Sequence, residues 1–224
     1  MRDEINKLFE RIENVKREFG ITQDIIVVAA TKTVSPERIN ELPSFGIKIA
    51  GENRVQEFLD KYDKVHGVDW HFIGALQTNK VKYIIDKVSL IHSIDRKSLV
   101  DEIDRQAAKH GLTANVLVEI NVGGEASKSG VSPDVAKDLI DYVAAKANVE
   151  LKGVMSVLPV GAPDELYIKL AEFGKYANEK YGAKIISAGM SGDYEKAIRF
   201  GANMIRPGSA IFGKRNYTEI RNNG

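Results

Sequence analysis

Residues 25–32 read IIVVAATK, a short run of apolar and β-branched residues that ends in a threonine and a lysine. A run that is apolar on both faces is typical of a strand in a parallel sheet covered by helices on one side and packed on the other. Seven further runs of this kind follow it, at 47–50, 70–75, 90–94, 115–122, 151–157, 184–189 and 203–206. Segments with helical signals separate them, so the sequence predicts eight strand–helix units.

Eight units with short connections favour a closed parallel (β/α)8 barrel, the TIM barrel of the α/β class, over an open doubly wound sheet. No linker rich in Pro, Gly or Ser interrupts the pattern, so we expect a single domain over residues 1–224. Apolar residues three or four positions apart predict an extra amphipathic helix over 1–20. The last residues, 214–224, are polar and are predicted to form a tail that frays.

Composition excludes several classes of function. Thirty-two basic and 31 acidic residues give a formal net charge of +1, so no overall field attracts nucleic acid or an anionic membrane. The absence of cysteine excludes disulfides, thiolate nucleophiles and cysteine-ligated metals, and the four histidines lack metal-ligand spacing. The N-terminus is charged and no apolar run approaches 18 residues, which favours a cytoplasmic protein. No separate dimerisation element is visible, so a monomer is expected.

Polar side chains stand where the predicted strands end, and in a barrel these positions meet at one mouth. Lys32 follows the first strand, and Glu52 and Asn53 follow the second. On the fifth strand, alternation places Glu119 and Asn121 on the face that should line the barrel. The sequence therefore predicts a functional site at this mouth.

Lys32 is the candidate nucleophile of that site. It stands in phase with the small residue Ala30, which leaves open space beside the amine. Confinement in a barrel mouth disfavours the charged ammonium form, and the neutral amine is the form that attacks an aldehyde. The alternative is a solvated lysine at a strand end.

Two loops near the end of the chain indicate a phosphate site. Residues 189–193 (GMSGD) and 206–210 (RPGSA) follow the seventh and eighth strands and offer backbone N–H groups at predicted helix starts. Ordinary helix capping is the alternative for each loop taken singly. Together with Lys32 they suit a compact phosphorylated aldehyde, of which pyridoxal 5'-phosphate (PLP) is one. Arg206 then either donates to the pyridine nitrogen or pairs with a barrel carboxylate such as Glu119, and both interpretations stay open.

Several blocks in order resemble the pyridoxal phosphate homeostasis protein family, which is related to the barrel domain of alanine racemase. They are AATKT at 29–33, GENRVQE at 51–57, WHFIGALQTNK at 70–80, INVGGEASKSG at 120–130, SAGMSGDYEKAI at 187–198 and RPGSAIFGKR at 206–215. The resemblance implies a cofactor linked to Lys32 as a Schiff base, Asn53 beside its ring and Arg206 near its pyridine nitrogen. It also implies that the phosphate is held around the following residues: Met190, Ser191, Gly208 and Ser209.

The resemblance further implies a role in vitamin B6 homeostasis without an established catalytic activity, with apo PLP enzymes as possible recipients of the cofactor. The sequence departs from the family pattern at Ala75, where histidine is common, and at Ser209, where threonine is common. Serine keeps the hydroxyl for a phosphate, whereas Ala75 removes a proton-transfer role from that loop.

A PLP-dependent racemase is the main alternative to a binding protein, and an aldolase that forms its imine with a sugar phosphate is another. A racemase of this type takes its second acid/base group from an additional domain and a neighbouring subunit, and the barrel here is expected to fill the chain. The sequence therefore favours a PLP binder. His71 is predicted to be a packed strand residue, and the loop Gly123–Ser132 with Lys128 is interpreted as solvated, or else as a flap with a second amine.

Overall fold

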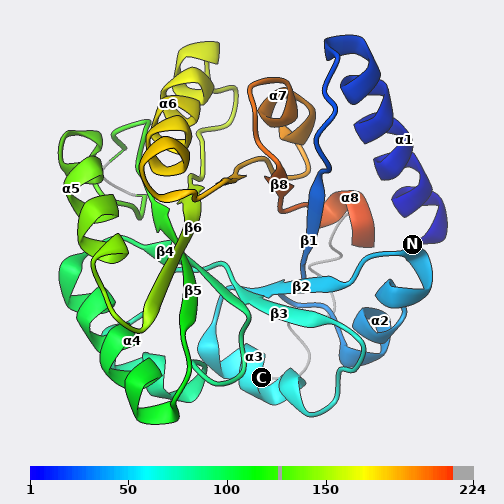
Figure 1. The fold of residues 1–224 in the computed structure, drawn as a ribbon. Helices are drawn as coiled ribbons and strands as arrows, with labels where there is room; N and C mark the ends of the chain where they lie inside the picture. Colours follow the sequence, from blue (N-terminus) through cyan, green and yellow to red (C-terminus); the bar gives the residue numbers. More distant parts are fainter. Residues whose placement is uncertain (126–127, 214–224) are drawn as a thin grey trace.

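The computed structural model describes residues 1–125 and 128–213, so the predicted tail 214–224 lies outside the described residues. Eight parallel strands form a closed barrel in sequence order, and β1 closes the barrel by pairing with β8 through Ile26 opposite Met204 (Figure 1). The strands are β1 (Ile26–Ala30), β2 (Ile49–Glu52), β3 (Asp69–Phe72), β4 (Leu90–Ile94), β5 (Ala114–Glu119), β6 (Val149–Met155), β7 (Ile185–Ser187) and β8 (Met204–Ile205). Each predicted apolar run overlaps one of them, which confirms the predicted barrel.

Helices surround the strands in Figure 1. They are α1 (Arg2–Phe19), α2 (Pro36–Asn40), α3 (Val55–Tyr62), α4 (Lys97–His110), α5 (Pro133–Ala144), α6 (Asp164–Tyr181), α7 (Tyr194–Arg199) and α8 (Ser209–Phe212). Two 3-10 helices, η1 (Leu42–Phe45) and η2 (Thr78–Tyr83), complete the set, and η2 stands where an α-helix would join β3 to β4. Pro36 and Pro133 stand at the first turn of α2 and α5, a position that suits proline because its missing N–H has no partner there.

The predicted N-terminal helix is confirmed as α1, which lies outside the barrel against α7 and α8. Its apolar stripe is buried there, through Ile5, Leu8, Ile12 and Val15. The helix ends at Gly20, whose φ of 65° is a left-handed conformation that costs glycine little. Within the described residues no helix has the length and apolar character needed to cross a membrane.

Two separate hydrophobic cores follow from the alternation of each strand. The larger core lies between the barrel and its helices and includes Val116 and Val118 of β5. The smaller core fills the barrel and includes Leu117 of β5, with Val28, Ile73, Leu90, Met155 and Met204. The face of β5 that carries Leu117 and Glu119 therefore lines the barrel interior, as alternation predicts.

Candidate functional site

A cavity of about 360 Å³ opens at the mouth formed by the carboxyl ends of the strands. Its lining residues are Ala30, Lys32, Asn53, Ile73, Val157, Met190, Ser191, Gly192, Arg206, Gly208 and Ser209. All seven residues expected to bind a cofactor are among them, although their roles in binding stay predictions. The cavity falls within the range of about 300–1,000 Å³ that is usual for small-molecule sites.

Lys32 reaches this cavity because it directly follows β1. Val28 and Ala30 of β1 face the barrel interior, and Lys32 is the next residue in the same phase. The side chain is half-buried at the mouth. Ala30 also lines the cavity, so a small residue does lie beside the amine.

The two glycine-rich loops are joined to each other by Ser191. Its Oγ accepts hydrogen bonds from the backbone N–H groups of Gly208 and Ala210, both at 3.0 Å. The first loop turns at Gly189, whose φ is 96°, and a Cβ there would lie 2.7 Å from the Cα of Tyr194. Only glycine fits this turn, and the turn brings the loops after β7 and β8 together.

Backbone N–H groups of these loops are available to an anion. Within residues 1–125 and 128–213, those of Ser191, Gly192 and Ser209 have no hydrogen-bond partner, and all three residues line the cavity. Helices α7 and α8 span only six and four residues, and α7 begins two residues after Gly192. Local N–H donors, more than the dipoles of such short helices, are therefore what suits a phosphate group.

Arg206 is buried on the floor of the cavity with two hydrogen bonds. Its Nη1 donates to Ser187 Oγ at 2.6 Å, and its Nη2 donates to the carbonyl oxygen of Ser156 at 2.9 Å. Within the described part of the chain no ion pair joins Arg206 to Glu119, so the pairing considered from the sequence does not form as a direct contact. Burial lowers the pKa of Arg206 to about 10, and the charge of Glu119 opposes that shift.

A chain of polar contacts runs from Arg206 into the barrel. Ser187 Oγ lies 3.3 Å from His92 Nδ1, and His92 Nε2 lies 3.0 Å from His71 Nδ1. Because the guanidinium only donates, the hydroxyl proton of Ser187 is free to point at His92 Nδ1, and His92 Nε2–H then donates to His71. Burial lowers the pKa of His71 to about 4 and that of His92 well below its ordinary value, so both rings are neutral. His71 is packed inside the barrel, as predicted.

Glu119 is a second titratable group inside the barrel. Burial raises its pKa to about 7, the charge of Arg206 opposes the shift, and the charge of Asp95 adds to it. The side chain is only 4% exposed. Its carboxyl group therefore changes charge near neutral pH without lining the cavity.

Glu52 does not lie where the sequence placed it. It is the last residue of β2 and fully buried, but its side chain points away from the cavity toward Thr31 and Lys61. Strand alternation explains the difference, because Glu52 and Asn53 are consecutive and face opposite sides. The expectation that both face the mouth is wrong for Glu52. The sequence offers no prediction for Lys61, because its pattern does not distinguish this residue from a solvated lysine of an amphipathic helix.

The described residues of the loop after β5 do not line the cavity. Lys128 pairs with Glu125 at 3.2 Å, and Asn121 Nδ2 donates to the carbonyl oxygen of Glu125 at 2.9 Å. Residues 126–127 lie outside the described residues, so the flap interpretation of Gly123–Ser132 stays a prediction. Within the described residues no group of three or more His, Cys, Asp or Glu side chains is arranged to hold a metal ion.

Comparison with known proteins places this geometry in a family. Residues 5–216 match the model for the alanine racemase N-terminal domain. A pyridoxal phosphate homeostasis protein of Aquifex aeolicus (strain VF5) is 42% identical over 224 residues, covering 96% of this chain and 98% of that protein. PipY of Synechococcus elongatus PCC7942, solved with PLP bound, is 25% identical with a TM-score of 0.78, covering 91% of this chain and 99% of PipY.

Alanine racemase from Corynebacterium glutamicum shares the fold with a TM-score of 0.70 and 16% identity. The match covers 92% of this chain but 61% of the racemase. The match to the family model and the identity to the Aquifex aeolicus protein show that the chain belongs to the pyridoxal phosphate homeostasis proteins, within the family of the alanine racemase N-terminal domain.

Proposed function

We propose that this protein binds PLP as a Schiff base on Lys32 and holds the cofactor for vitamin B6 homeostasis without catalytic turnover. The observation that carries the proposal is the shared cavity, in which the Lys32 amine lies with the N–H donors of the two loops. The amine suits the aldehyde group of a phosphorylated aldehyde, and the N–H donors suit its phosphate group. The names of the relatives and the PLP-bound state of PipY support the same cofactor.

The polar lining residues and Met190 each have a definite role in this proposal. The Lys32 nitrogen bonds to the aldehyde carbon, a C=N bond replaces C=O, and the oxygen leaves as water. Ser191, Gly192, Gly208 and Ser209 surround the phosphate, with Met190 at the rim and Asn53 beside the ring. Arg206 donates to the pyridine nitrogen and leaves it unprotonated.

The cavity favours binding over racemisation. Bound PLP supplies an electron-withdrawing ring, and an arginine-paired pyridine withdraws electrons less than a protonated one. Racemisation also needs proton exchange on both faces of a substrate. Among the described lining residues, the ionisable side chains are Lys32 and Arg206, and Arg206 is held by Ser187 and Ser156. A PLP-dependent racemase remains the alternative.

Borohydride reduction tests the attachment site. Protein incubated with PLP should turn yellow, and reduction should fix pyridoxyl mass on the peptide that contains Lys32. Lys32→Ala should abolish this label, and Lys128→Ala, which removes the amine of the neighbouring loop, should keep it. Label confined to another lysine in the wild type would contradict the assignment.

Isotope exchange separates the binder from the racemase. With PLP bound, a panel of amino acids in deuterium oxide should show negligible exchange at the α-carbon. Rapid exchange that Lys32→Ala abolishes would establish the racemase instead. Label that forms only with a sugar phosphate would indicate the aldolase.

A wider set of proposals follows from the same function. We propose that residues 1–224 act as one barrel domain, that the protein is a cytoplasmic monomer, and that apo PLP enzymes receive the cofactor. Transfer to such enzymes should be faster than free release of PLP from this protein. Equal rates would remove the need for a direct recipient.

A further inference from the structure

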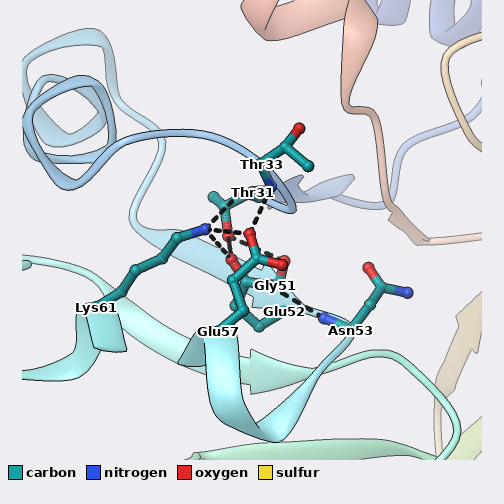
Figure 2. Close-up of polar contacts among 7 residues, drawn as sticks. All are labelled: Thr31, Thr33, Gly51, Glu52, Asn53, Glu57 and Lys61. Carbon is teal, nitrogen blue, oxygen red and sulfur yellow. Dashed lines mark hydrogen bonds and ion pairs between the residues drawn. The ribbon is translucent and has the colours of Figure 1, made fainter. Parts of the chain in front are cut away.

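Lys61 of α3 is a buried lysine outside the cavity lining. Its ammonium group contacts three acceptors: the carbonyl oxygen of Thr31 at 2.9 Å, Glu52 Oε1 at 2.6 Å and Glu57 Oε1 at 2.7 Å (Figure 2). All three of its N–H donors therefore have partners. We call this group the Lys61 network: Thr31, Thr33, Glu52, Glu57 and Lys61.

The Lys61 network holds the chain on both sides of Lys32. On the preceding side, Lys61 binds the Thr31 carbonyl oxygen, and the Thr31 hydroxyl donates to Glu52 Oε1 at 2.8 Å. On the following side, the backbone N–H of Thr33 donates to Glu57 Oε1. Lys61 contacts both carboxylates, so one ammonium group ties the two sides together (Figure 2).

The backbone at Thr33 is strained. Its φ is 64°, and within residues 1–125 and 128–213 it is the one residue other than glycine with a positive φ. A β-branched residue rarely adopts this conformation and keeps it only where the surroundings impose it. The bond from Thr33 N–H to Glu57 is such a constraint, and it sits next to Lys32.

The same network reaches a second lining residue. Glu52 Oε2 accepts the backbone N–H of Asn53 at 3.3 Å, and Asn53 lines the cavity. Burial raises the pKa of Glu52, while the hydrogen bond and charge of Lys61 oppose that shift. Lys61 thus favours the ionised carboxylate that binds both Thr31 and Asn53.

We propose that Lys61 is a positioning residue that, through Glu52 and Glu57, sets the direction in which Lys32 enters the cavity. The inference rests on the proposed function, because the direction of Lys32 matters only if its amine must approach the aldehyde of a bound ligand. Among the described residues no hydrogen bond or ion pair joins the Lys61 network to the phosphate loops after β7 and β8; the nearest link is the backbone bond from Ala30 N–H to the Pro207 carbonyl oxygen at 2.9 Å. Removal of the Lys61 ammonium group is therefore expected to slow covalent attachment at Lys32 more than it weakens phosphate binding.

Two ligands measure these two properties separately. PLP with cyanoborohydride reports the rate of label formation at Lys32. Pyridoxine 5'-phosphate has an alcohol in place of the aldehyde and reports binding without attachment. Lys61→Met should slow label formation by at least about tenfold, the scale of small losses of reactive geometry. Its affinity for pyridoxine 5'-phosphate should fall much less, by no more than about threefold, because the phosphate loops keep their own hydrogen bonds and only the bond from Glu52 to the Asn53 N–H is weakened.

The matched control is Lys146→Met. Lys146 also pairs with a carboxylate, Asp101, at 2.6 Å, but neither residue lines the cavity. It should leave both measurements unchanged. An equal loss of both in Lys61→Met, or no loss of label formation, would overturn the proposal.

Two milder variants keep the test decisive if Lys61→Met fails to fold. Glu57→Gln keeps the shape of the side chain and removes its charge. Thr33→Gly keeps φ 64° accessible but opens many other backbone conformations beside Lys32, so the direction of the lysine is held less firmly. Both should slow labelling of Lys32 while binding of pyridoxine 5'-phosphate is kept, and unchanged labelling in both would contradict the proposal. Failure of the proposed function looks different, because the wild type itself would then carry no label at Lys32.

Discussion

Glu119 and Arg206 place a carboxyl group and a guanidinium inside the barrel without a direct ion pair. The pKa of Glu119 is raised by burial to about 7, above the ordinary value of 4.5 for a glutamate carboxyl group in the unfolded chain. Between these two values the folded protein binds more protons at this site than the unfolded chain does. The stabilisation from Glu119 is therefore full at low pH and is lost as pH rises through 7.

Glu119→Gln should remove this pH dependence. The free energy of unfolding of the variant, relative to the wild type, should rise between pH 5 and pH 8 by on the order of 2–3 kcal/mol. Urea unfolding at both pH values measures it. The buried His71 titrates in both proteins, so its contribution cancels in the difference. A difference that is constant with pH would show that Glu119 titrates normally.

At the residue scale, the sequence predicted a side chain's direction correctly where the alternation of the preceding strand could be read from it. Lys32 and Asn53 follow strands in the interior phase, so their arrival at one cavity was predictable. The prediction for Glu52 was wrong because position in the chain alone does not show the alternation that turns this side chain away from the cavity. Lys61 was beyond reach because its burial depends on packing of α3 beside the loop after β1. Its place three residues after the buried Phe58 was the one available signal.

At the scale of elements, β2 and β3 approach each other closely where both reach the mouth. Ile73 N–H donates to the carbonyl oxygen of Glu52 at 2.8 Å, and a Cβ on Gly74 would lie 2.7 Å from the Cα of Asn53. That neighbour is backbone, which does not move aside as a flexible side chain would. Glycine at 74 therefore sets the spacing of these strand ends.

Gly74→Ala should push the two strand ends apart. We expect a loss of stability on the order of 1–3 kcal/mol, as for overpacked sites, and weaker PLP binding because Asn53 lines the cavity. Urea unfolding and a spectroscopic titration measure the two effects. Gly192→Ala is the control for stability, since its Cβ would meet no atom within 4 Å. Equal stability of the two variants would count against a tight contact at Gly74.

Most element positions were predictable because their signals are local. Apolar runs mark the strands, and proline or glycine marks several helix ends. The segment between β3 and β4 could not be predicted in this way, because it forms the 3-10 helix η2 in place of an α-helix. Helices α7 and α8 follow the phosphate loops and span six and four residues, and both pack against α1.

The whole molecule is one closed ring of strands, and the cavity is lined by residues on or after β1, β2, β3, β6, β7 and β8, so it spans the point of closure. The repeat of eight similar units made this architecture predictable from sequence. A ligand held across the closure binds the folded protein and not the unfolded chain. PLP should therefore stabilise the entire fold rather than one loop.

Thermal unfolding tests this coupling. PLP at about a hundred times its Kd should add about 2.7 kcal/mol, which for a protein of this size raises Tm by roughly 5–10 °C. Lys32→Ala should show a smaller rise at the same PLP concentration. For a monomer, Tm should not change with protein concentration. A concentration-dependent Tm would indicate association.

The pairing of Ile26 with Met204 also has a consequence for biosynthesis. The ribosome releases β1 and Lys32 early, whereas β8 and the loop after it come out near the end of translation. Until then the first strand has no partner on one edge, and the loops that we propose to bind phosphate have not been made. If these loops hold the cofactor as proposed, only chains whose synthesis has passed β8 present the complete cavity.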